Sequence, residues 1–150
     1  MPATDGPTHR YVGASPGCWA IFGAVQVRGY EDVRYAIHQM GVDTYMAQHP
    51  GTPSPQSIQS VAVHLIGLCL YLEHGYTSDQ GRAALTQAVR HKAAFVWLVP
   101  PPALGTRTVL DVYTARDVSA CADMVRQWAY AVWEAWAPHH AVIRAWAALL

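Results

Sequence analysis

One long apolar segment in the middle of the chain constrains the fold more than any other feature. Residues 54–75 read SPQSIQSVAVHLIGLCLYLEHG, and apolar side chains recur in them at every third or fourth position. This spacing is typical of an α-helix with one face in a hydrophobic core. Ser54 and Pro55 are favourable residues for a helix start, and Gly75 is favourable for a C-terminal cap. We therefore expect a long helix here, packed against a core.

Similar start and stop signals predict helices on both sides of this segment. Ser15-Pro16 repeats the Ser-Pro start, and Glu31 with Asp32 places acidic residues in a first turn, where they suit the helix dipole. Gly29 is expected to end the first of these helices. Further helices are predicted over residues 16–28, 31–48, 78–92 and 117–136, and the proline at position 138 either kinks the last one or opens a final segment over 139–150.

Two segments break the helical pattern. Residues 95–105 contain three consecutive prolines, which exclude both a helix and a central strand. Residues 108–113 are predicted to form a short strand or a docked loop. With four or five helices and no paired strands, the sequence predicts an all-α fold, a four- to five-helix bundle in a single domain over 1–150. Residues 1–14 are expected to form an extended N-terminal arm.

The composition is that of a folded chain with apolar surface patches. Of the 150 residues 52% are hydrophobic and 13% are charged, against about 25% charged in an average domain. Six tryptophans and eight tyrosines point the same way, so we expect self-association, with a homodimer as the simplest form. Ten basic residues balance ten acidic ones without forming a basic stripe, which argues against nucleic-acid binding.

The chain is expected to be cytoplasmic and to have no membrane contact. Its first residues, MPATDGPTHRY, contain neither the basic nor the apolar region of a secretory signal. No uncharged apolar run reaches about 18 residues, the length of a transmembrane helix. The cysteines at positions 18, 69 and 121 are odd in number and far apart, which is not the pattern of a disulfide framework.

The candidate chemical groups are histidines, of which the chain has eight. On the helix predicted over 31–48, His38, Tyr45 and His49 fall on one face, and Asp43 lies about 140° from it. Such a face can be an ordinary surface, and His49 at the helix end can simply bond the last carbonyl groups. The alternative is that His49 is a metal ligand or a general base.

His64 lies in the apolar run SVAVHLIGL. An imidazole buried there needs a polar partner, because an unsatisfied buried group costs about 1–3 kcal/mol. The hydroxyl groups of Ser57 and Ser60, seven and four residues earlier, are on roughly the same side of the helix. A metal ion inside the bundle is the alternative partner.

Three further positions could contribute ligands. Adjacent helical residues point about 100° apart, so one of His139 and His140 can face inward while the other faces solvent. Cys18 is near a predicted helix N-terminus, which lowers the pKa of a thiol, so it is either a thiolate ligand or a packed residue. His9 lies in the N-terminal arm, while His74 and His91 are interpreted as helix caps. The chain has no Gly-rich phosphate loop, no HExxH and no CxxC.

Four segments carry a resemblance to a known family: THRYVGASPGCWAIFG, VDTYMAQHPG, SPQSIQSVAVHLIGL and WAYAVWEAWAPHHAVIRAW. Together they resemble a family of small uncharacterised bacterial proteins, known only as a domain of unknown function. The match covers nearly the whole chain, and QHPG is its most specific part. Many members start with a Cys-Pro-Gly-Cys-like sequence that this chain lacks, so the resemblance implies no zinc knuckle there.

A second similarity is to DinB-like helical bundles, and it rests on the segments SIQSVAVHL and HHAVIRAW. DinB-like proteins often bind a divalent metal through three histidines, one on the second helix and two on the last. The resemblance implies His64 and His140 (or His139) as ligands. The position of the third ligand carries Trp136 instead. Two other histidines are then candidates to replace it: His49 and His38.

The leading functional hypothesis is a metal-binding protein or a metal-dependent enzyme that acts on a small molecule. His49, His64 and His140 would bind Zn, Ni or Fe and leave a coordination position open for water or substrate. Asp43 and Tyr45 would orient these ligands or act as acid and base. Three additional ligands are candidates: His9, Cys18 and His38.

Two other functions are compatible with the sequence. One is a metal-free binding pocket or cyclase-like enzyme for a small organic ligand, with an apolar lining of Trp128, Trp133, Trp136 and Tyr45. The other is a non-enzymatic helical dimer whose Trp-rich last helix forms the interface.

Overall fold

A computed structural model describes residues 5–31 and 37–150 of this protein, and the regular structure within these residues is helical. Within these ranges there is no strand, so the predicted all-α, bundle-like fold is confirmed. The α-helices are α1 (Pro16–Glu31), α2 (His38–Gln48), α3 (Pro55–His74), α4 (Ser78–Ala88), α5 (Val109–Tyr113), α6 (Val118–Ala135) and α7 (His140–Ala147), and the 3₁₀ helices are η1 (Val89–Ala94) and η2 (Ala137–His139).

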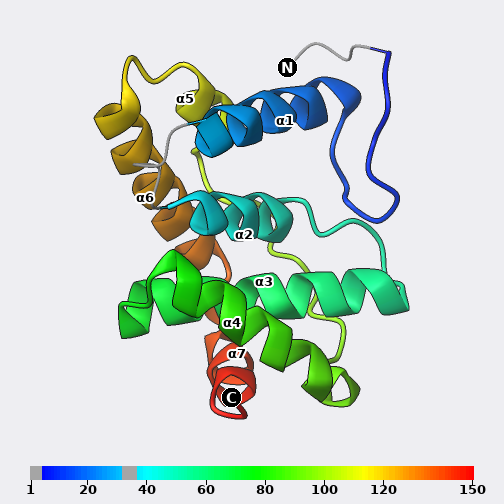
Figure 1. Ribbon diagram of the computed structural model, residues 1–150. Helices are drawn as coiled ribbons and strands as arrows, with labels where there is room; N and C mark the ends of the chain where they lie inside the picture. The colour runs from blue at the N-terminus through cyan, green and yellow to red at the C-terminus, as the bar shows by residue number, and fades with distance from the viewer. Residues whose placement is uncertain (1–4, 32–36) are drawn as a thin grey trace.

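Helix α3 is the centre of the fold. Figure 1 shows α1, α2 and α3 stacked one above the other, with α4 and α7 against the lower side of α3 and α6 descending along one end of the stack. The predicted caps are present: the Ser54 hydroxyl oxygen accepts a hydrogen bond from the Ser57 amide at 3.0 Å, and Gly75 has φ +67°. Buried residues occupy most of the helix from Val61 to Tyr71.

The length and composition of α3 would also allow it to cross a membrane. Its most apolar 18-residue window is, however, 61% buried inside the protein. Its burial against the rest of the chain makes α3 a core helix of this fold.

Residues 109–113 differ from the prediction, since they form the helix α5 and not a strand or a loop. The Thr108 hydroxyl accepts a hydrogen bond from the Leu110 amide, and the Asp111 carboxylate accepts one from the Thr108 amide at 2.7 Å. This reciprocal capping box stabilises a first helical turn even where β-branched residues favour a strand. Val109 and Val112, three residues apart, are both buried against the core.

Two predicted boundaries were also wrong. Helix α1 continues through Gly29 to Glu31, and α4 gives way to the 3₁₀ helix η1 before its predicted end at 92. A glycine ends a helix only where a left-handed cap forms, so its presence alone is a weak stop signal. The start predicted for the second helix, at 31–32, partly lies outside the described residues.

Two tryptophans, one on α6 and one at its C-terminal cap, attach that helix to the end of α2. The Trp136 indole donates a hydrogen bond to the Ala47 carbonyl oxygen at 3.1 Å, and the Trp128 indole donates to the Gln48 side-chain oxygen at 2.9 Å. The Gln48 amide nitrogen in turn donates to the carbonyl oxygens of Leu104 and Arg107, at 2.9 and 2.7 Å. One side chain thus joins α2, α6 and the proline-rich segment.

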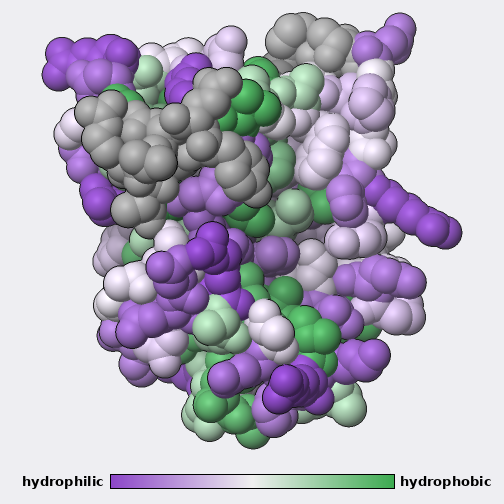
Figure 2. Space-filling view, viewed as in Figure 1, coloured by the Kyte–Doolittle hydropathy of each residue, from purple (hydrophilic) through white to green (hydrophobic). Residues whose placement is uncertain are grey.

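The face of the molecule seen in Figure 2 is mixed in polarity. Polar atoms predominate, and apolar patches appear mainly in the lower half, over the region of α3, α4 and α7. Several valines and leucines are exposed elsewhere, among them Val96, Val99 and Leu149. The homodimer expected from the composition stays a prediction.

Helix α7 is tied to the end of α3 by one ion pair. The Arg144 guanidinium donates two hydrogen bonds to the Glu73 carboxylate, from Nε at 2.9 Å and from an Nη at 2.6 Å. This contact holds the pKa of Glu73 below its usual value of 4.5.

We predict that Glu73→Gln lowers the melting temperature by a few degrees at neutral pH. Because the pKa of Glu73 is lower in the folded chain, the ion pair stabilises the fold above the unfolded-state pKa, and this contribution is lost as the pH falls through the folded-state pKa. Thermal melts of both proteins between pH 7 and pH 3 should therefore converge at the acid end. A constant difference over this range would contradict the assignment.

Candidate functional site

Helix α2 presents two polar side chains to opposite sides of the core. Asp43 and Tyr45 are both fully buried, and two residues along an α-helix place side chains about 200° apart. Asp43 contacts His64 on α3, whereas Tyr45 contacts Cys18 on α1. Each of these contacts belongs to a separate cluster.

The first is the thiol cluster, which we define as Cys18, Tyr45 and His49. Cys18 lies in the first turn of α1, where its amide donates to the Ser15 hydroxyl at 3.3 Å. Its Sγ is 3.5 Å from His49 Nε2, and the Tyr45 hydroxyl donates to the same sulfur at 3.5 Å. Three of the residues predicted from sequence are thus brought together around one sulfur atom.

Aromatic rings enclose the thiol cluster. Tyr45 stacks on Phe22 with ring centroids 4.0 Å apart, and the His49 ring lies 4.4 Å from Tyr45 on another side. Burial raises the pKa of Tyr45 and lowers the pKa of His49. Tyr45 therefore keeps its proton, and His49 is a neutral imidazole at pH 7 that can offer a lone pair.

The N-terminal arm closes this end of the molecule. The Gly13 amide donates to the His49 carbonyl oxygen at 3.1 Å. Gly51, with φ +70°, packs against the backbone of Tyr11. A Cβ at position 51 would be 2.6 Å from the Tyr11 carbonyl oxygen, so only glycine allows the arm to lie this close.

The second is the carboxylate–imidazole pair of Asp43 and His64. Asp43 Oδ1 is 2.6 Å from His64 Nδ1 and also accepts a hydrogen bond from Gln39 at 3.1 Å. Burial raises the pKa of Asp43, and the contact with His64 works in the opposite direction. The partner of His64 is therefore a carboxylate on another helix, and not the Ser57 or Ser60 hydroxyl that the sequence suggested.

Space for this pair depends on a glycine of α3. A Cβ at Gly67 would lie 2.5 Å from Asp43 Oδ2. The Tyr71 hydroxyl is near enough to lower the pKa of Asp43, but neither it nor Oδ2 makes a hydrogen bond of ordinary geometry within the described residues. Among the described residues, Oδ1 thus makes both hydrogen bonds of ordinary geometry, with His64 and Gln39, while the Tyr71 hydroxyl lies near the carboxylate.

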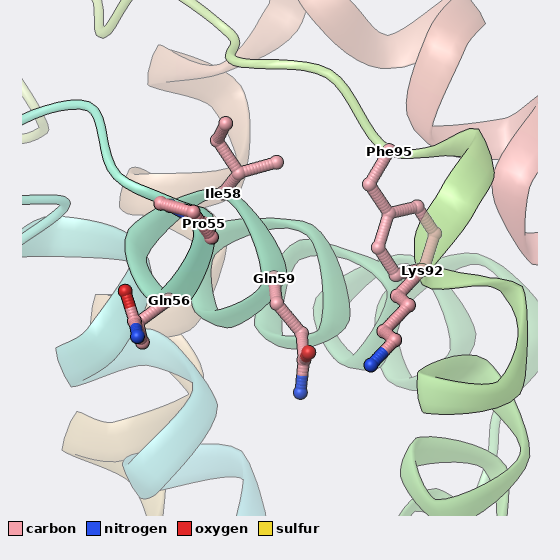
Figure 3. Close-up of a pocket in the computed structure, with 6 residues that line it drawn as sticks. All are labelled: Pro55, Gln56, Ile58, Gln59, Lys92 and Phe95. Atoms are coloured by element: carbon pink, nitrogen blue, oxygen red, sulfur yellow. The ribbon is translucent and has the colours of Figure 1, made fainter.

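His64 is partly exposed, with 16% of its side-chain surface accessible, and it faces a hollow of about 240 Å³. The other residues that line this hollow are Tyr11, Gln56, Gln59, Ser60 and Val63. A larger groove of about 440 Å³ runs between α3 and η1 (Figure 3), where the side chains of Gln59 and Lys92 point the same way.

The remaining predicted residues lie elsewhere. His140 begins α7, stacks on Trp133 at 3.8 Å and has Nε2 2.9 Å from the Trp133 carbonyl oxygen. His9 packs edge-on against Tyr11 in the arm, and its Nδ1 is buried without a hydrogen-bond partner among the described residues. His38 begins α2, where burial and the charge of Arg82 lower its pKa.

The three histidines expected to share one metal are in three different places. His49, His64 and His140 each contact a different partner, and in the described ranges none of them belongs to a group of three possible ligands within 4.8 Å of one another. Their joint role as ligands stays a prediction that would require the side chains to move. Trp128, Trp133 and Trp136 are themselves buried in the core.

The structure contains one group that sequence reasoning missed. Possible ligand atoms of Cys69, Glu73 and His74 lie within 4.8 Å of one another at the end of α3. Cys69 and Glu73 are four residues apart, which places them on one face of the helix. This spacing is the feature of the sequence from which the group could have been predicted. Burial raises the pKa of Cys69 to about 11, with a further contribution from Glu73.

Comparisons with known proteins give one match. Residues 3–137 match the family described as "Family of unknown function (DUF5946)", which confirms the resemblance to a domain of unknown function. No curated protein and no solved structure matches significantly. The DinB-like resemblance is not confirmed.

We predict that Gly67→Ala destabilises the fold by about 1–3 kcal/mol, because the new methyl group displaces the Asp43 carboxylate in a filled core. Gly23→Ala is the matched control. Gly23 is exposed inside α1 with open space around it, so alanine should stabilise the fold by about 0.5–1 kcal/mol. Urea denaturation measures both, and equal effects of the two substitutions would show that Asp43 does not need the space at Gly67.

Proposed function

We propose that this chain, which belongs to the family of unknown function that its sequence matches, binds a divalent metal ion of the zinc type at Cys18 and His49. The observation that carries the proposal is the 3.5 Å distance between Cys18 Sγ and His49 Nε2. Zinc binds sulfur at about 2.3 Å and imidazole nitrogen at about 2.0–2.1 Å, so tetrahedral geometry places two such ligands about 3.6 Å apart.

The surroundings of both donors suit a metal ion. Cys18 lies in the first turn of α1, and its backbone amide donates to the Ser15 hydroxyl at 3.3 Å, which fixes the position of the residue. Burial lowers the pKa of His49, which favours the neutral form that a metal ligand needs, and its carbonyl oxygen accepts a hydrogen bond from the Gly13 amide. The soft sulfur and the imidazole together favour zinc over magnesium or calcium.

Further ligands would come from water, from a bound molecule, or from the arm. His9 is the protein candidate, because its Nδ1 is buried without a partner among the described residues and its ring lies 5.2 Å from Trp19, the neighbour of Cys18. Two protein ligands with open positions are an incomplete coordination shell. Affinity therefore depends on whether His9 or a bound molecule completes it.

A second candidate is the group at Cys69, Glu73 and His74. It offers three donor atoms within 4.8 Å, which is the observation in its favour. Both Glu73 oxygens, however, already accept hydrogen bonds from Arg144. A metal there must displace a charged partner, whereas one at Cys18 and His49 displaces only a weak sulfur–nitrogen contact.

The test is the zinc content of chelator-treated protein that has been returned to one equivalent of zinc and desalted. We predict about one zinc ion per chain, reduced at least tenfold in Cys18→Ser and His49→Ala. Cys121→Ser is the matched control, since this thiol lies on α6 and contacts the Val112 carbonyl oxygen. It should bind zinc as the unaltered chain does, and so should Cys69→Ser.

The outcomes separate the candidates. Loss of zinc in Cys69→Ser and His74→Ala alone would overturn the proposal in favour of the second group. Absence of zinc from the unaltered chain would overturn both. In that case rapid, His49-dependent alkylation of Cys18 would identify the pair as a reactive thiol and its base. Circular dichroism establishes that each variant is folded.

A further inference from the structure

The pair of Asp43 and His64 lies on the other side of α2 from the thiol cluster, and it has the geometry of an acid–base pair. His64 Nδ1 is 2.6 Å from a fully buried carboxylate. The opposite edge of the ring carries Nε2, which has no protein partner in the part of the chain described here. His64 itself lines the hollow, together with Tyr11, Gln59 and Ser60 among others.

We propose that His64 is a general base that activates water toward a small neutral ester bound in this hollow, and that Asp43 positions it. The carboxylate accepts the Nδ1 proton, which leaves the lone pair on Nε2. This assignment goes beyond the metal site and does not depend on it.

The lining of the hollow indicates the class of ligand. Besides His64 it consists of two amide side chains, two hydroxyl groups and Val63, so it contains no fixed charge. Amides and hydroxyls offer both donors and acceptors to a neutral polar molecule, whereas an ionic ligand would find no opposite charge there. The volume of about 240 Å³ restricts the ligand to a small one.

In the proposed step His64 alone accepts the proton from water and later returns it to the leaving group. Water loses a proton to Nε2 while its oxygen forms a bond to the acyl carbon, and the resulting imidazolium is stabilised by the Asp43 carboxylate. The bond from the acyl carbon to the alcohol oxygen then breaks. The imidazolium returns the proton to the leaving alcohol, so the products are a carboxylic acid and an alcohol.

If the pair of Asp43 and His64 had only a structural role, the His64 ring would not need to be accessible from the surface. A histidine that only satisfied Asp43 could be buried completely, and Gln39 already donates to the same oxygen. Here the carboxylate is enclosed while the imidazole reaches a polar hollow at the surface. This arrangement is the one that proton transfer to a bound molecule requires.

The experiment uses p-nitrophenyl acetate, a neutral ester, with the full chain, and follows the release of p-nitrophenolate. We expect hydrolysis above the buffer rate, reduced about 100-fold or more in His64→Gln. Asp43→Asn should be equally impaired, because the amide can donate to Nδ1 and move the ring proton to Nε2. Long-range proton–nitrogen NMR reads this tautomer directly.

Gln59→Trp provides a variant that does not touch Asp43. It should fill the hollow and slow hydrolysis while the His64 tautomer stays unchanged, which keeps the test informative if Asp43→Asn does not fold. Cys121→Ser, on α6 and outside both sites, is the matched control and should retain full hydrolysis, while His64→Gln should lose hydrolysis and retain zinc. The two proposals can therefore fail separately.

Two results would overturn the inference. One is hydrolysis by the unaltered chain no faster than by His64→Gln. The other is an unchanged rate in Asp43→Asn despite an altered tautomer. A rate that falls in His64→Gln, Asp43→Asn and Gln59→Trp, but not in Cys121→Ser, would establish it.

Discussion

The hydrogen bonds of the Gln48 side chain are the contact on which the rest of the structure depends. Its amide nitrogen donates to two carbonyl oxygens of a segment that has no secondary structure of its own, and its oxygen accepts from Trp128. The amide therefore uses three of its hydrogen-bonding positions inside the protein. Because His49 follows directly, this anchor also fixes the imidazole that approaches Cys18, and α2 becomes the rigid support of both clusters.

Helix α2 is unusual in burying polar groups on two sides. A buried carboxylate is costly unless it is hydrogen-bonded, and Asp43 meets that requirement through His64 and Gln39, with Gly67 supplying the space. The Tyr45 hydroxyl has a hydrogen-bond partner as well, because it donates to the Cys18 sulfur. Apolar residues of similar volume at both positions would fill the same space without a polar group that needs a partner.

The sequence predicted the local features of the fold well and the long-range contacts of the site poorly. The caps of α3 and α6 were correct because a capping side chain bonds to an amide two or three residues away. Helix α5 was missed because its valines favour a strand and its Thr108–Asp111 capping box decides otherwise. Asp43 was correctly placed away from the face of Tyr45 and His49, but no periodicity shows which residue of another helix it meets, 21 positions further along the chain.

The close approach of the arm to Gly51 has a consequence for both clusters. Tyr11, held over Gly51, lines the hollow at His64, and Gly13, two residues later, bonds to His49. One short segment is thus a common cover for two chemically different sites. Movement of this segment would take Tyr11 from the hollow and the Gly13 amide from His49 at the same time, so the surroundings of the two clusters are coupled through one short stretch of chain.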